Sequence, residues 1–185
     1  MLRVLRFALL TALVAVPVAA LEIAGVGLPD TIAVNGQQLQ LNGAGVRKKV
    51  FFKIYVGALY VEQRSHDGAR LMAAEGPRQM LMHFLFKEVE KEKLVEAWRE
   101  GFANNSASNL AALKQRLDTF CGWWPSMKAG ERAVMTYVPG VGTKLEINGK
   151  EIGVVPGKDF ADALLAVWVG AKPPTEDLKR GVLGQ

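Results

Sequence analysis

The chain has 185 residues, of which half are hydrophobic, with 23 basic and 18 acidic side chains and a formal net charge of +5 at pH 7. Its closest approach to a basic cluster is Arg47, Lys48, Lys49 and Lys53, and no nucleic-acid motif or aromatic stacking platform accompanies it, so we expect no nucleic-acid partner. The single cysteine excludes an internal disulfide.

Residues 1–20 have the three zones of a secretory signal. Arg3 and Arg6 form a basic start, an apolar run covers residues 7–16, and small residues end at Ala20. A membrane-spanning helix needs about 20 apolar residues, so this run predicts a cleaved signal, and an uncleaved interfacial helix is the alternative. We therefore expect a mature domain of residues 21–185, without a stable membrane anchor, that is periplasmic or secreted.

Turn residues divide the remaining chain into short segments without a repeat or a long linker. Asn35-Gly36 separates residues 32–34 from 38–41, and Asn148-Gly149 separates residues 144–147 from 150–154, so both predict tight hairpins. Further strands are expected at residues 50–61, 80–86 and 133–138.

Four segments show the apolar spacing or the start signals of helices. Two lie in the middle, at residues 94–102 and 110–120, a third begins near Asp159, and Thr175 caps a short fourth. Strands, a helical pair, more strands and terminal helices together predict one α+β domain. In such a domain the helices gather on one side of an antiparallel sheet.

The strand predicted at residues 50–61 has two different faces. One face is wholly apolar and is expected to be core: Val50, Phe52, Ile54, Val56 and Ala58. The other carries Tyr55 and, if the strand extends back far enough, Arg47. A cation beside a phenol among apolar neighbours suits a ligand with an anionic head and a hydrophobic body. The alternative is that Arg47, Lys49 and Lys53 only solvate the outer face of a half-buried strand.

The other polar residues form no catalytic or metal-binding set. His66 and His83 lack the spacing of metal ligands, so no metal site is expected, and His83 is expected in the core of an apolar strand. Cys121 stands beside aromatic residues and is expected to be buried and unreactive. The glycines at 43 and 45 follow a hairpin and precede a strand, unlike a phosphate loop, and no cofactor is expected.

Five segments resemble those of the chalcone isomerase-like family, in its exported bacterial branch. GAGVR at 43–47 and FKIYVGALYVE at 52–62 resemble the core signature of the family. FADALL at 160–165, WVG at 168–170 and DLKR at 177–180 follow the order and spacing of its closing helices. The resemblance covers most of residues 25–184.

The resemblance implies an open-faced β-sandwich, in which helices layer a large antiparallel sheet and leave a cleft between them. The family includes plant enzymes that close a chalcone into a flavanone, fatty-acid-binding relatives, and chalcone isomerase-like proteins of bacteria. In that family Arg47 corresponds to an arginine that contacts ligand, and Tyr55 to a tyrosine of the fatty-acid-binding branch. Trp98 and Trp168 are then candidates to line the cleft.

Most partner residues of the plant enzymes are absent from this chain. Tyr55 and Val167 stand where threonines are expected, and residues 93–101 contain neither tyrosine nor asparagine. A shift of the alignment by one helical turn brings Asn104 or Asn105 to the asparagine position.

These departures favour an exported, noncatalytic binder of a fatty acid or a similar amphipathic carboxylate, held by Arg47 and Tyr55. One alternative is an intramolecular lyase or isomerase acting on an unsaturated ketone, in which Arg47 is the catalytic residue. Another is an interaction protein with a collapsed cleft. The sequence leaves the oligomeric state open.

Overall fold

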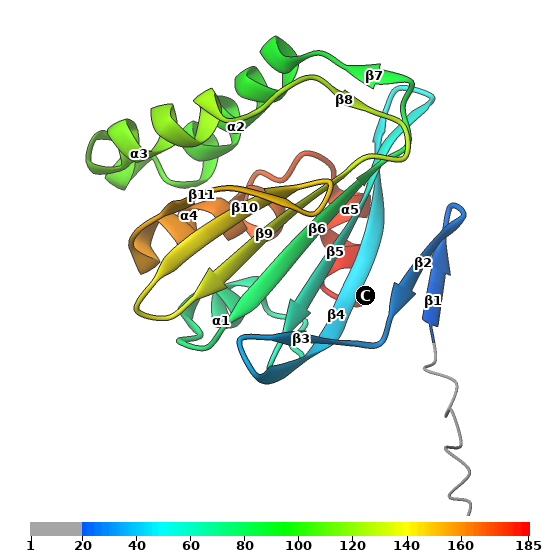
Figure 1. The fold of residues 1–185 in the computed structure, drawn as a ribbon, viewed down its shortest axis with the longest axis horizontal. Helices are drawn as coiled ribbons and strands as arrows, with labels where there is room; N and C mark the ends of the chain where they lie inside the picture. Colours follow the sequence, from blue (N-terminus) through cyan, green and yellow to red (C-terminus); the bar gives the residue numbers. More distant parts are fainter. Residues whose placement is uncertain (1–19) are drawn as a thin grey trace, which may run out of the picture.

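A seven-stranded antiparallel sheet forms the centre of the computed structural model, which describes residues 20–185 (Figure 1). The expected signal therefore lies outside the described residues, except for Ala20. The strand order is β11-β10-β9-β6-β5-β4-β3. The strands are β3 (Thr31–Val34), β4 (Gln37–Lys49), β5 (Phe52–Val61), β6 (Arg78–Phe84), β9 (Arg132–Val138), β10 (Gly142–Ile147) and β11 (Lys150–Val155).

Both predicted Asn-Gly hairpins are present, joining β3 to β4 and β10 to β11. Asn35 and Asn148 have φ values of 48° and 53°, a conformation that asparagine tolerates and that two-residue hairpin turns require. Two small two-stranded sheets were not predicted. They pair β1 (Ala20–Ile23) with β2 (Val26–Pro29), and β7 (Glu88–Val89) with β8 (Met127–Lys128).

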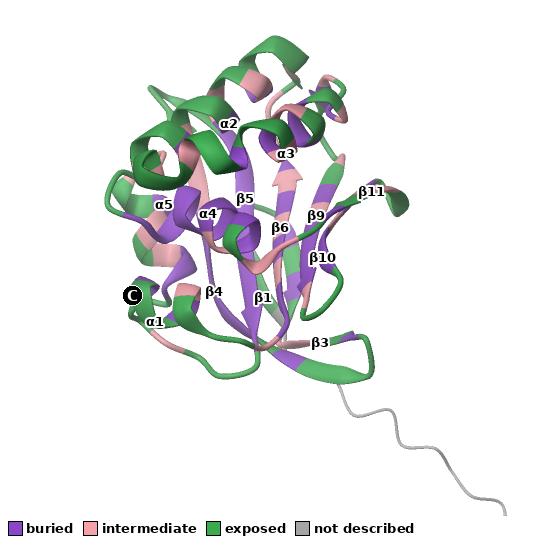
Figure 2. Cartoon of the chain, turned by 90° about the vertical axis from the view of Figure 1, so that its left-hand side faces the viewer, coloured by how far each residue is buried: buried purple, intermediate pink, exposed green. Residues whose placement is uncertain are grey.

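Helices cover one face of the seven-stranded sheet, as Figure 2 shows in a side view. The four predicted helices are α2 (Lys91–Asn105), α3 (Leu110–Gly122), α4 (Lys158–Val169) and α5 (Glu176–Val182), and α1 (Gly68–Ala73) was not predicted. The Thr175 side chain caps α5 by accepting a hydrogen bond from the backbone N–H of Leu178 at 3.2 Å. None of the helices in residues 20–185 is long and apolar enough to span a membrane.

Helix α4 is the centre of the larger hydrophobic core. All but three of its residues are buried, because it packs against α1, α2, α5 and the sheet. A helix that is apolar on every side is stable in water only in such a position. A smaller core lies on the opposite face of the sheet, where Val26 and Leu28 of β2 pack with Leu39, Val56 and Tyr60.

The Gly-Ala-Gly segment of β4 is a docking surface for the backbone of α5. A Cβ atom on Gly43 would lie 2.3 Å from the carbonyl oxygen of Gly181, and one on Gly45 would lie 3.1 Å from that of Leu178. Asn42 beside them donates a hydrogen bond to the carbonyl oxygen of Val182 at 2.9 Å. The two glycines therefore allow close packing of a helix on a strand.

The strand expected at residues 50–61 begins two residues late, at Phe52. Val50 and Phe51 form the turn between β4 and β5, and Val50 has a φ of 56°. Val50 and Phe52 are consequently exposed, so their assignment to the core was wrong, whereas Ile54, Val56 and Ala58 are buried. The segment contains no glycine, asparagine or proline to signal a turn, and it turns because β4 and β5 pair with each other.

Candidate functional site

A cleft of about 150 Å³ opens between the sheet and helix α2. Arg47 of β4, Tyr55 of β5 and Met82 of β6 line it on the sheet side, and Trp98 of α2 and Val167 of α4 line it on the helix side. The cleft thus collects side chains from five elements. Glu100, Asn104 and Lys172 add polar groups to this lining.

Arg47 and Tyr55 lie directly opposite each other on β4 and β5. Directly opposed residues of an antiparallel pair point to the same face of the sheet, so both side chains reach the cleft. The guanidinium carbon of Arg47 lies 5.8 Å from the centroid of the Tyr55 ring, in the range of a cation–π contact. Their predicted shared face is present, but it arises from two paired strands and not from one continuous strand.

Tyr55 is buried and held in place by Trp168. Its hydroxyl oxygen accepts a hydrogen bond from the Trp168 Nε1–H at 3.1 Å. Burial raises the pKa of Tyr55, and the Arg47 charge and the Trp168 hydrogen bond oppose that rise without cancelling it. The phenol is therefore neutral at physiological pH. Its O–H can donate a hydrogen bond to a ligand oxygen at the cleft.

The guanidinium of Arg47 is partly buried and makes no ion pair with any residue from 20 to 185. Its Nε–H group is buried without a hydrogen-bond partner in that part of the chain. Burial of an unpaired polar group costs stability, so each such group calls for an explanation, and a bound ligand or water is one. The Arg47 Nε–H can thus donate a hydrogen bond at a cleft that Glu100 also lines.

Trp98 adds a third donor to the lining of the cleft. Its Nε1–H is buried and, within the described residues, has no hydrogen-bond partner. The Trp98 ring packs edge-on against Trp168, with 5.4 Å between the ring centroids. Of the two tryptophans predicted to line the cleft, Trp98 therefore does so directly, and Trp168 acts through the hydroxyl of Tyr55.

A second, outer groove of about 450 Å³ adjoins the cleft and shares Arg47, Ala97 and Glu100 with it. Ile54, Phe86 and Val89 supply apolar surface, and Lys49 and Lys93 also line it. Four glutamates also line the groove, so its walls are more acidic than those of the inner cleft: Glu88, Glu90, Glu96 and Glu100. Sequence patterns did not indicate this groove, because it depends on how α2 lies across the β4–β5 hairpin.

Residues 20–184 match the family model described as chalcone isomerase-like. The chain belongs to the chalcone isomerase-like family. A comparison with curated proteins finds no match. Among solved structures, a fatty-acid binding protein of Arabidopsis thaliana is similar, with a TM-score of 0.71 and 15% sequence identity over 89% of this chain and 96% of that one. This likeness shows the fold and confirms the predicted α+β architecture of a large antiparallel sheet layered by helices.

In this chalcone isomerase-like protein the two candidate asparagines have different surroundings. Asn104 lines the cleft. Asn105 points elsewhere, because its side chain donates to the carbonyl oxygens of Gly101 and Lys172 at 3.0 and 2.9 Å. Val167 brings an apolar surface to the position where the plant enzymes are expected to have a threonine.

The remaining sequence candidates lie away from this chalcone isomerase-like cleft. His83 is half-buried on the opposite face of β6, so its assignment to the core was wrong. Its partial burial and the charge of Arg132 lower the pKa of His83. Cys121 is buried, and burial raises the pKa of its thiol to about 11. Within residues 20–185, His, Cys, Asp and Glu form no group of three that could hold a metal ion.

Proposed function

We propose that this chalcone isomerase-like protein is a noncatalytic binder of a fatty acid or a similar amphipathic carboxylate. The observation that supports the proposal is the pair of opposed donors at the cleft, Arg47 and Tyr55, with a buried Arg47 Nε–H that lacks a partner in residues 20–185. A carboxylate accepts two parallel hydrogen bonds from a guanidinium, and a neutral phenol adds a third. The donors match such a head group in charge and number.

The hydrocarbon tail would enter the inner cleft, because a single glutamate, Glu100, lines it. Met82, Leu94 and Val167 line it, whereas the outer groove has four carboxylates in its walls. A protein cavity of about 150 Å³ accommodates a molecule of the size of benzene, or about six heavy atoms. We therefore expect the affinity for fatty acids to increase up to about six to eight carbon atoms, and to increase further only if α2 moves away from the sheet.

Calorimetric titration of fatty acids and of the uncharged alcohols of the same length tests the proposal. Hydrogen bonds to a charged group contribute about 1.5–3 kcal/mol, so Arg47→Ala should weaken the binding of acids by roughly ten- to a hundredfold. The variant should bind the alcohols as the wild type does. Arg132→Ala is the matched control, because Arg132 is an exposed arginine of β9 outside the cleft.

Thermal melts of the same variants separate a binding role from a structural one. Arg47 makes no ion pair within the described part of the chain, so its removal should change the melting temperature little. Equal affinity of wild type and Arg47→Ala for the acids would refute the head-group assignment. Failure of the wild type to bind any acid of the series would refute the binder function.

A second candidate function is an intramolecular lyase or isomerase of the chalcone isomerase type. The observation that favours it is that Asn104 lines the same cleft as Arg47. A reaction of this type needs orientation of the substrate and stabilisation of negative charge. We expect no loss of chalcone absorbance above the rate in buffer. A saturable rate that Arg47→Ala abolishes would establish the isomerase instead.

We further propose that the protein acts in the periplasm or outside the cell, after cleavage behind Ala20. The three zones of residues 1–20 support this proposal. Intact-mass measurement of protein recovered from the cell envelope and the medium tests it. A species that begins at Met1, or one confined to the cytosol, would refute it.

A further inference from the structure

The tip of the β4–β5 hairpin, residues 48–53, has the most exposed apolar side chains among residues 20–185. Phe51 is 93% exposed, Val50 78% and Phe52 59%. The three are consecutive, so they form one apolar projection and not scattered surface residues. Folding leaves these side chains in water, so they contribute no free energy of apolar burial to the stability of the domain.

The turn itself is made of residues that do not favour a turn. The hairpins β3–β4 and β10–β11 turn at Asn-Gly, whereas β4–β5 turns at Val50-Phe51. Val50 has a φ of 56°, a conformation that is disfavoured for a β-branched residue. Residues that break a local rule without a benefit to the fold are found most often at functional positions.

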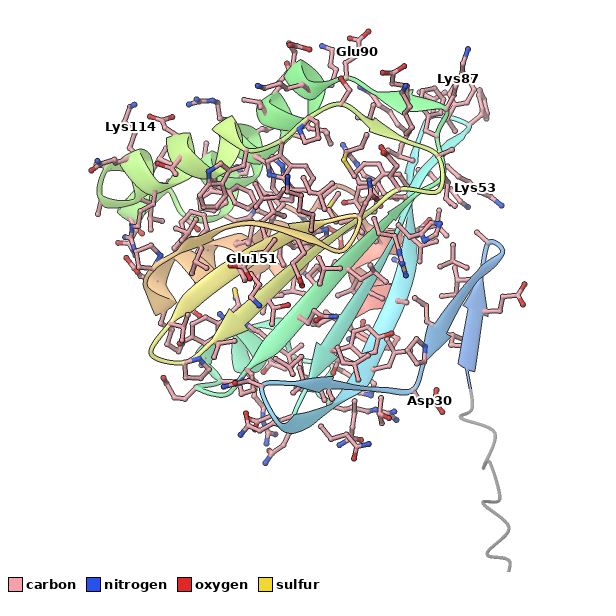
Figure 3. The ribbon with its side chains drawn as sticks, in the orientation of Figure 1. Asp30, Lys53, Lys87, Glu90, Lys114 and Glu151 are labelled. Carbon is pink, nitrogen blue, oxygen red and sulfur yellow. The ribbon has the colours of Figure 1, made fainter. Side chains whose placement is uncertain are left out.

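Lysines surround the apolar tip. Lys48, Lys49 and Lys53 are exposed, and none forms an ion pair with any residue that the structure describes. Figure 3 places Lys53 and Lys87 at the same end of the molecule. Phe86, next to Lys87, packs its ring edge-on against Phe52 with 5.4 Å between centroids. The tip thus combines exposed aromatic and aliphatic side chains with a collar of lysines, while Glu88 and Glu90 line the groove beside Lys49.

We propose that the β4–β5 tip docks onto the surface of an anionic lipid bilayer. Val50, Phe51 and Phe52 would enter the boundary between head groups and acyl chains, and the lysines would lie at the level of the lipid phosphates. Charge complementarity selects this partner. A second copy of the chain bound tip to tip would bring the two collars of lysine together, and like charges repel.

Docking in this orientation brings the cleft close to the lipid. Arg47 is three residues before Val50, a separation of roughly 10 Å along an extended strand. An amphiphile leaving the bilayer would therefore meet the Arg47 side chain within a short distance. This consequence rests on the proposed function, whereas docking of the tip does not.

Sedimentation with lipid vesicles tests the docking directly. The full chain is expressed and purified as the cell processes it, and all variants share its N-terminus. In about 0.1 M salt we expect binding to phosphatidylcholine vesicles that contain about one quarter phosphatidylglycerol, and little binding to pure phosphatidylcholine. Phe51→Ser should weaken binding roughly tenfold or more, and changing Lys48, Lys49 and Lys53 to glutamine on the order of a hundredfold.

Val141→Ser is the matched control, because Val141 is an exposed apolar residue in the turn between β9 and β10, at the opposite end of the sheet. It should bind the anionic vesicles as the wild type does. Equal binding by wild type and Phe51→Ser would overturn the proposal. A wild-type dimer in sedimentation velocity that Phe51→Ser dissolves would also overturn it, in favour of a second copy as the partner.

An environment-sensitive dye reports the depth of the tip. Cys121 is buried with a raised thiol pKa, so a dye that reacts with thiols labels an added cysteine selectively in the folded protein. We expect a blue shift of the dye at Phe51→Cys on addition of anionic vesicles, and none at Val141→Cys. Identical spectra with and without vesicles at Phe51→Cys would contradict insertion.

Discussion

Replacing Tyr55 by phenylalanine removes one oxygen atom from the wall of the cleft and leaves the ring in place. The Tyr55 hydroxyl accepts the Nε1–H of Trp168 at 3.1 Å, and the side chains on both sides of this bond are buried. The substitution leaves the Trp168 donor without an acceptor, which costs about 1–3 kcal/mol. In a domain of this size about 1 kcal/mol lowers the melting temperature by about 2–4 °C, so we expect a decrease of about 2–12 °C.

Tyr60→Phe provides the matched control for this experiment. Tyr60 is also buried on β5, but it lies in the smaller core on the other face of the sheet. Its hydroxyl is buried and has no hydrogen-bond partner among residues 20–185, and burial raises its pKa to about 12. Removal of an unpaired buried hydroxyl should leave stability unchanged or raise it slightly.

Urea denaturation of both variants measures the difference as a change in midpoint at constant slope. Equal losses for Tyr55→Phe and Tyr60→Phe would refute a stabilising role of the bond to Trp168. A double-mutant cycle with Trp168→Phe makes the test specific, because the two substitutions should then be less than additive. Fully additive effects would show that the two side chains act independently.

Two further predictions concern the frame around the cleft. Gly43→Ala would place a Cβ atom 2.3 Å from a carbonyl oxygen of α5, so urea denaturation should show that the free energy of unfolding falls by at least about 1–3 kcal/mol. Gly27→Ala is the control and should lose much less, because its Cβ atom would contact nothing within 4 Å. Burial and the charge of Arg132 lower the pKa of His83, so its contribution to stability is complete above about pH 6.5 and is lost as the pH falls toward the folded pKa. His83→Gln should therefore flatten the pH dependence of the melting temperature in that window, and an unchanged profile would contradict the assignment.

The sequence by itself determined those features whose signals are local. Asn35-Gly36 and Asn148-Gly149 form the turns that they predict, because their backbones accept positive φ more readily than other residues do. Apolar spacing located the four longer or capped helices, and Thr175 caps α5 as expected. The α+β class follows from these elements, and the signature segments indicated the family before any contact was known.

Tertiary structure alone decided how the cleft is built. The turn at Val50-Phe51 contains no turn signal and exists because β4 pairs with β5, and this pairing places Arg47 opposite Tyr55. The acceptor for the Trp168 N–H stands 113 residues away in the chain. Such contacts form between residues that are far apart in the sequence. Local sequence patterns do not indicate which distant residues will contact each other. The unpaired donors of the cleft and the exposed lysine-ringed tip became visible only once those partners were in place.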